Sequence, residues 1–96
     1  MRTFFKDPGD TTDWVFDWST YLGTGETVST STITADAGIT VGNGSNGAPA
    51  PSHDGTSATF WLIGGSDGQR YKLTNIITTS AGRTVERSIY VQVTVR

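Results

Sequence analysis

The chain has 96 residues, a formal net charge of −2 and no cysteine. This length suits a single domain with one modest core. The lack of cysteine excludes disulfides, thiolate metal sites and cysteine nucleophiles, and the lack of Lys or Arg clusters argues against a nucleic-acid surface.

The composition predicts an all-β domain. Only 34% of the residues are hydrophobic and 17% are charged, and Thr, Ser and Gly dominate the remainder. Thr fits a pleated surface, while Gly and Ser supply turns. No apolar run is long enough for a secretory signal or a membrane span, so we expect synthesis in a cytosol and no membrane contact.

The N-terminal part predicts an arm followed by an aromatic strand. Residues 1–13 are expected to form the arm, in which Phe4 and Phe5 can dock on a neighbouring protein and Lys6 to Asp10 makes a turn. Residues 14–18 then alternate, so Trp14, Phe16 and Trp18 share one face. We expect this face to belong to the core.

The middle of the chain predicts short strands around a long loop. Val28 to Ala35 and Ile39 to Val41 are strand candidates, and residues 42–55 are rich in Gly, Pro, Asn and Ser. Such a long irregular segment predicts a flexible, functional loop. The next strand, Ser57 to Ile63, is largely apolar on both faces, which makes Trp61 either a contact residue or a core residue.

The last thirty residues predict a β-hairpin. Tyr71 to Thr79 and Val85 to Arg96 are separated by a turn at Ser80 to Gly82, and the second run alternates apolar odd positions with polar even ones. Arg87 falls on the inward register. We expect it to reach the sheet rim or pair with a carboxylate, or alternatively to contact another subunit.

The strand pattern predicts the architecture. About seven antiparallel strands at roughly ten-residue spacing favour a β-sandwich or small barrel. Tyr71 follows Gly68 at the start of the penultimate strand, as in the tyrosine corner of immunoglobulin-like sandwiches. We therefore predict an immunoglobulin-like β-sandwich over residues 14–96.

The sequence predicts no catalytic, cofactor or metal site. His53 lies beside Asp54, but sequence neighbours do not form a catalytic triad, and a solvated loop histidine is the favoured interpretation. The acidic run has no EF-hand spacing, which leaves calcium a minor alternative, and no carboxylate pair indicates glycoside hydrolysis. A second alternative is a sugar-stacking platform built from Trp14, Trp18, Trp61, Tyr21, Tyr71 and Tyr90.

Several strings resemble a known family. They are Lys6 to Asp10, Asp17 to Ser19, Trp61 to Gly65, Gly68 to Asn75, Ile77 to Thr84 and Arg87-Ser88. Together they resemble the small fiber-tail adaptors of tailed phages and prophages, which are single-domain, immunoglobulin-like virion proteins. The resemblance implies a non-enzymatic structural protein at the neck or tail of the virion, made in the cytoplasm of the host bacterium.

The resemblance also implies partners. We expect neck, tail, connector or fiber subunits to bind the protein, in many copies on a symmetric particle. The expected contacts are Phe4, Phe5, Trp61, Asn46, Pro49 and His53. A head-decoration protein and a carbohydrate-binding or host-adhesion module are the alternative functions.

Overall fold

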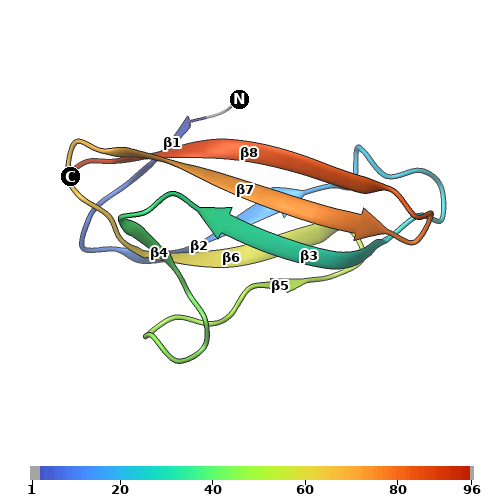
Figure 1. The fold of residues 1–96 in the computed structure, drawn as a ribbon, viewed down its shortest axis with the longest axis horizontal. Helices are drawn as coiled ribbons and strands as arrows, with labels where there is room; N and C mark the ends of the chain where they lie inside the picture. Colours follow the sequence, from blue (N-terminus) through green and yellow to red (C-terminus); the bar gives the residue numbers. More distant parts are fainter. Residues whose placement is uncertain (1–2, 96) are drawn as a thin grey trace.

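The computed structural model describes residues 3–95, which form eight strands in two facing sheets (Figure 1). Met1, Arg2 and Arg96, the outermost residues of the predicted arm and domain, lie outside the described residues. In chain order the strands are β1 (Thr3–Lys6), β2 (Thr11–Asp17), β3 (Val28–Ala35), β4 (Ile39–Val41), β5 (Ser52–His53), β6 (Ser57–Gly64), β7 (Arg70–Thr79) and β8 (Thr84–Val93). Within residues 3–95 there is no helix with the length and apolar character needed to cross a membrane.

The larger sheet has the strand order β1-β8-β7-β3, and the smaller sheet has the order β2-β6-β4, with β5 also paired to β6. The all-β prediction is confirmed, but the expectation that every strand pairs antiparallel is wrong. β1 lies beside the outer edge of β8 and runs parallel to it. The additional β5 is only two residues long, too short to show periodicity.

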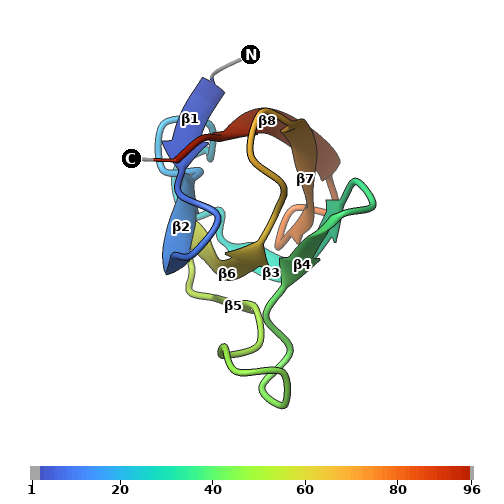
Figure 2. The ribbon, with the colours of Figure 1, turned by 90° about the vertical axis from the view of Figure 1, so that its left-hand side faces the viewer.

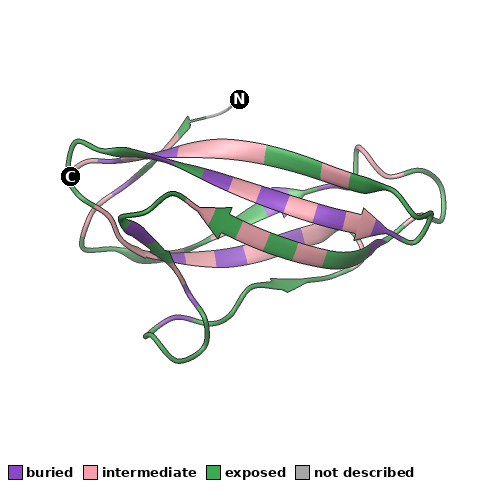
Figure 3. Cartoon of the chain, viewed as in Figure 1, coloured by how far each residue is buried: buried purple, intermediate pink, exposed green. Residues whose placement is uncertain are grey.

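The C-terminal hairpin forms as the alternation predicts. Tyr71 pairs with Val91 and Leu73 with Ile89, and the turn contains Gly82 at a positive φ of 85°. Buried and exposed residues alternate along β7, as the colours in Figure 3 show. The strand therefore presents one face to the opposite sheet and the other to solvent.

The core lies between the sheets and contains the predicted aromatic face. Phe16 and Trp18 are buried, and Trp14 packs against the same cluster. The Trp18 indole N–H donates to Asn75 Oδ1 at 2.8 Å, and the Asn75 amide donates in turn to Ser31 Oγ and Thr32 O. A buried polar network is stable only when its members are paired, and this one links β2, β7 and β3.

A buried lysine fastens β1 to the opposite side of the fold. The Lys6 side chain has 2% of its surface exposed, and its Nζ donates to Gly64 O at 2.7 Å and to Asp7 O at 2.9 Å. Burial lowers the pKa of this amine from its ordinary value, while the carboxylates of Asp10 and Asp7 act in the opposite direction. The two carbonyl acceptors compensate for removing the ammonium group from water.

Candidate interaction surfaces

His53 and Asp54 make separate hydrogen bonds in the structure. No three His, Asp or Glu side chains among residues 3–95 are placed to hold a metal ion. The exposed His53 has its Nε2 3.2 Å from Ser29 O, where the ring N–H can donate. Asp54 accepts hydrogen bonds from the backbone N–H groups of Thr56 and Ser57, which lower the pKa of its carboxyl group. The two neighbours are therefore engaged with different parts of the backbone.

The aromatic pair on β1 is divided between the inside and the outside of the fold. Phe4 points inward and meets Trp14 edge-to-face, with ring centroids 5.5 Å apart. Phe5 points the other way and is 55% exposed. Strand alternation explains this division. We call this region, with Phe4 and Phe5, the β1 surface.

The outer face of the smaller sheet places Trp61 where a partner can reach it. Trp61 alternates with the buried Phe60 and Leu62, so its side chain lies on the outer face and is only partly covered. It is opposite Asp13 of β2, and the neighbouring Val15 is 59% exposed. Trp61 is therefore not part of the core between the sheets.

The loop between β4 and β5 begins beside Trp61. Gly42 N–H donates to Trp61 O at 2.8 Å, and a Cβ at Gly42 would lie 2.4 Å from Pro49 O, so the loop closes tightly at its base. Asn46 stabilises the turn by accepting from Asn43 N–H and donating to Val41 O. Asn46, Pro49 and His53 are exposed. We call Trp61 with these three residues the loop surface.

The β1 surface and the loop surface lie on opposite sides of the molecule. Figure 2 looks along the long axis, with β1 at the top and the loop between β4 and β5 at the bottom. The structure thus brings Trp61 close to the base of the loop but separates both from Phe4 and Phe5. The six predicted contacts form two groups.

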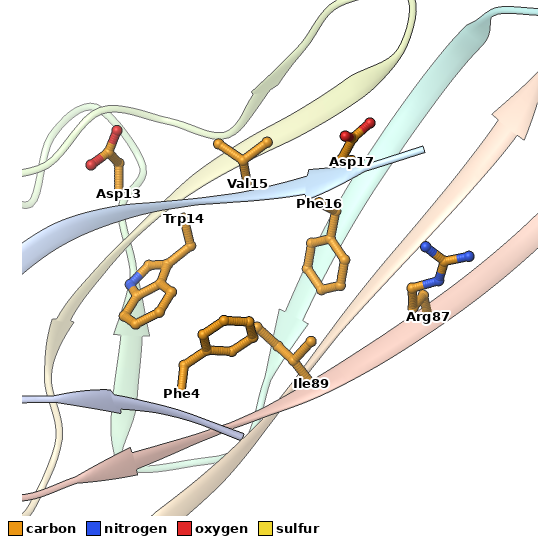
Figure 4. Close-up of a pocket in the computed structure, with 8 residues that line it drawn as sticks. All are labelled: Phe4, Asp13, Trp14, Val15, Phe16, Asp17, Arg87 and Ile89. Atoms are coloured by element: carbon orange, nitrogen blue, oxygen red, sulfur yellow. The ribbon is translucent and has the colours of Figure 1, made fainter. Parts of the chain in front are cut away.

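A cleft that the sequence did not predict opens between β2 and β8. It has a volume of about 380 Å³. Figure 4 shows the side chains of Asp13, Val15 and Asp17 turned to the other side of β2. The side chains that face the cleft are those of Phe4, Trp14, Phe16, Arg87 and Ile89. We call this feature the β2–β8 cleft.

One cation, Arg87, faces the cleft. Its guanidinium lies 4.6 Å from the centroid of the Trp18 ring, and of the two expected arrangements, the sheet rim or a carboxylate pair, the carboxylate pair is not formed among residues 3–95. The Trp14 indole Nε1 is buried and has no acceptor in the described part of the chain. Arg87 has the inward register that alternation predicts, but it stacks on an aromatic ring in place of an ion pair.

An ion pair closes the end of the molecule where Arg83 lies. Glu26 accepts hydrogen bonds from the guanidinium of Arg83 and from Thr79 Oγ1, and its side chain is 6% exposed. These bonds lower the pKa of the Glu26 carboxyl group to about 2. The bond from Arg83 has the largest effect, and the bond from Thr79 has the next largest. Arg83 also stacks on Tyr21 at 4.8 Å. The pair ties the segment after β2 to the β7–β8 turn.

The sequence was compared with known families. It matches the family described as podophage GP4 fiber-tail adaptor protein gp77 over residues 6–92. The chain belongs to this family. A comparison with curated proteins gives no match.

Family membership confirms the function that the resemblance implied. The adaptor is a structural, non-enzymatic component of the podophage virion tail, where it links fibers to the tail. Its partners are accordingly fiber and tail proteins. This role favours the adaptor over the head-decoration and carbohydrate-binding alternatives.

Proposed function

We propose that the adaptor joins fiber and tail through two separate surfaces, each specific for one partner. The observation that carries this proposal is the separation of the β1 surface from the loop surface on opposite sides of the molecule (Figures 1 and 2). A linker between two proteins needs two contacts that can be occupied together. Surfaces on opposite sides meet this condition without steric conflict between the partners.

The β1 surface contributes an exposed aromatic ring. Phe5 is 55% exposed, and aromatic residues are enriched at the centres of protein interfaces. Lys6 holds the end of β1 through Gly64 O, so Phe5 is presented from a fixed strand. We propose that the part of the predicted arm between β1 and β2, residues 7–10, adjusts to the partner on assembly.

The loop surface combines a partly covered ring with exposed polar groups. Trp61 offers the apolar centre, while Asn46, Pro49 and His53 surround it from the loop and β5. An apolar centre with a polar rim is the usual anatomy of a specific interface. We propose that the flexible part of residues 42–55 orders against this partner.

Two substitutions test the proposal, each serving as the control for the other. Phe5→Ser should weaken binding to one purified partner, fiber or tail, by about tenfold or more, as expected for an interface-centre aromatic. Trp61→Ala should weaken binding to the other partner by a similar factor. Binding of each variant to both proteins is measured by calorimetry. Loss of the same partner by both variants would contradict two separate surfaces.

We also propose that the sandwich is immunoglobulin-like. The strand orders β8-β7-β3 and β2-β6-β4 correspond to the G-F-C and B-E-D orders of immunoglobulin sheets. Tyr71 lies at the start of β7, and its hydroxyl accepts a hydrogen bond from Ser66 N–H at 2.9 Å. A tyrosine bonded to the backbone a few residues upstream is the tyrosine corner of these domains, which supports the proposal.

We further propose that several copies surround the tail axis. Tail components assemble with rotational symmetry, and repeated weak contacts then act together. Quantitative mass spectrometry of purified tails can compare the amount of adaptor with that of a tail-ring subunit of known copy number. We expect the ratio to correspond to more than one adaptor per tail. A single copy per tail would contradict the proposal.

A further inference from the structure

The β2–β8 cleft lies where both sheets have an unpaired edge. In the described part of the chain, β2 pairs with β6 only. β1 covers β8 from Tyr90 to Val93, so the outer edge from Thr84 to Arg87 has no strand beside it within residues 3–95. We call this segment the free edge of β8. Unpaired edges of this kind are templates for a strand from another chain.

The interior of the cleft is suited to one large apolar side chain. Trp14 and Phe16 point into it from β2, and Ile89 points into it from β8 (Figure 4). Its volume of about 380 Å³ is at the small end of the range for binding pockets, roughly 300 to 1,000 Å³. The cleft is therefore apolar in lining and limited in size.

The charge of the cleft selects an acidic occupant. Arg87 is exposed and makes no ion pair among the described residues. Asp13 and Asp17 also border the cleft, but their carboxylates are turned to the opposite side of β2 (Figure 4). Asp17 also accepts a hydrogen bond from Ser19 N–H. A carboxylate would satisfy the guanidinium that faces the cleft, and main-chain carbonyl groups would satisfy N–H groups of the free edge of β8.

We propose that the cleft binds an extended segment of a fiber or tail protein, which adds as a strand along the free edge of β8. An apolar side chain of this segment enters between Phe16 and Ile89, and an adjacent carboxylate pairs with Arg87. Main-chain hydrogen bonds supply affinity in this mode of recognition, while the pocket and the charge supply specificity. The inference rests on the adaptor function and specifies the chemistry of one partner.

The occupant is a different protein and not a second copy of the adaptor. The acidic aromatic segment Asp13 to Asp17 is already built into β2. Charge complementarity thus favours a heterologous segment.

The first test is a charge reversal with a matched control. Arg87→Glu should weaken binding to one of the two purified partners, fiber or tail protein, by tenfold or more, because it places like charges together in the cleft. Arg70→Glu is the control, since Arg70 also stacks on an aromatic ring, Tyr90, at 4.4 Å but does not line the cleft. The control should bind within about twofold of the unmodified protein. Unchanged binding of Arg87→Glu to both partners would overturn the inference.

Hydrogen exchange on the unmodified adaptor gives a second, independent test. When the partner is added, amides of the free edge of β8 that point away from β7 should exchange more slowly. Exchange at the same rate in the free and bound states would overturn strand addition. Sedimentation at increasing concentration tests for self-association, and a dimer that Arg87→Glu abolishes would overturn the heterologous occupant.

The cleft inference and the two-surface proposal can fail independently, and the same set of variants distinguishes the two failures. If Phe5→Ser and Trp61→Ala each lose one partner while Arg87→Glu loses none, the cleft inference fails and the two surfaces stand. If Arg87→Glu alone weakens binding, the cleft stands and the two-surface proposal fails. Thermal unfolding of every variant confirms that each one is folded.

Discussion

Two tryptophans of the same aromatic face, Trp14 within β2 and Trp18 directly after it, have different surroundings. Trp18 has no exposed surface, and its indole N–H is bonded to Asn75 at 2.8 Å. Trp14, four positions earlier on the same face, lines the β2–β8 cleft and has an indole N–H without an acceptor in the described residues. The same residue type is thus fully hydrogen-bonded at one of these positions and lacks an acceptor in the described residues at the other.

This contrast shows which polar groups of the aromatic face are satisfied within the sandwich and which are not. Every polar atom of the Trp18–Asn75 pair is engaged with another part of the sandwich. Trp14 instead packs against Phe4 of β1, and its indole N–H has no acceptor among residues 3–95. A change at Trp18 should therefore reduce stability more than a change at Trp14.

The largest effect is expected for Trp18→Phe. The smaller ring leaves a cavity and removes the donor to Asn75 Oδ1, so the free energy of unfolding should fall by about 3 kcal/mol. Urea unfolding followed by circular dichroism measures this loss. A loss below about 1 kcal/mol would remove the contrast between the two tryptophans, because Trp18 would then not be held by its network.

Tyr71→Phe should have a smaller effect on stability. It removes one partly buried hydrogen bond, from Ser66 N–H to the tyrosine hydroxyl, and should lower the free energy of unfolding by about 1 kcal/mol. The change keeps the ring and its packing. Urea unfolding gives the value, and an unchanged stability would show that the hydrogen bond between Ser66 and Tyr71 does not stabilise the fold.

The Glu26–Arg83 pair should make stability depend on acid pH. The pKa of Glu26 is about 2 in the folded protein, below the ordinary value of 4.5. The unfolded chain thus takes up the proton first, and the contribution of the pair is present above pH 4.5 and is lost as the pH falls toward 2. Because Arg83 is 47% exposed, salt should weaken this contribution.

Two variants check the assignment of this pH dependence. Glu26→Gln and Arg83→Met should each reduce the loss of stability between pH 4.5 and 2, measured by urea unfolding at several pH values. If both variants retained the full loss over this range, its origin would lie in other carboxylates.

The smallest change in stability is expected for Trp14→Phe. This substitution removes an indole N–H that has no acceptor among residues 3–95 and keeps an aromatic ring against Phe4. The free energy of unfolding should change by less than about 1 kcal/mol, because no hydrogen bond is lost. A loss as large as that of Trp18→Phe would mean that Trp14 and Trp18 serve the core equally.

The alternation of residue types was sufficient to predict the parts of the fold that face the core. It gave the β7–β8 hairpin, the inward register of Arg87 and the shared face of Trp14, Phe16 and Trp18. These features depend on a local period of two, which a sequence displays directly.

Other features depend on contacts between distant segments. The parallel pairing of Thr3 with Tyr90 joins residues from the two ends of the chain, and no local pattern specifies it. The cleft depends on how far β1 extends along β8, so it also had no signal in the sequence. The sequence feature that came closest to indicating the cleft was Arg87, a charged residue among apolar ones on an inward register. The two-residue β5 forms through pairing with β6 alone.

The parallel pairing of β1 and β8 has a mechanical consequence. The chain enters at the start of β1 and leaves at the end of β8, so a force that pulls these two points apart slides the strands past each other along their length. The ladder from Thr3 to Lys6 and the bonds of Lys6 Nζ then bear the load together, and they cannot be opened one at a time. A tether held at its two termini would resist tension through this pair of strands before any other part of the fold is strained.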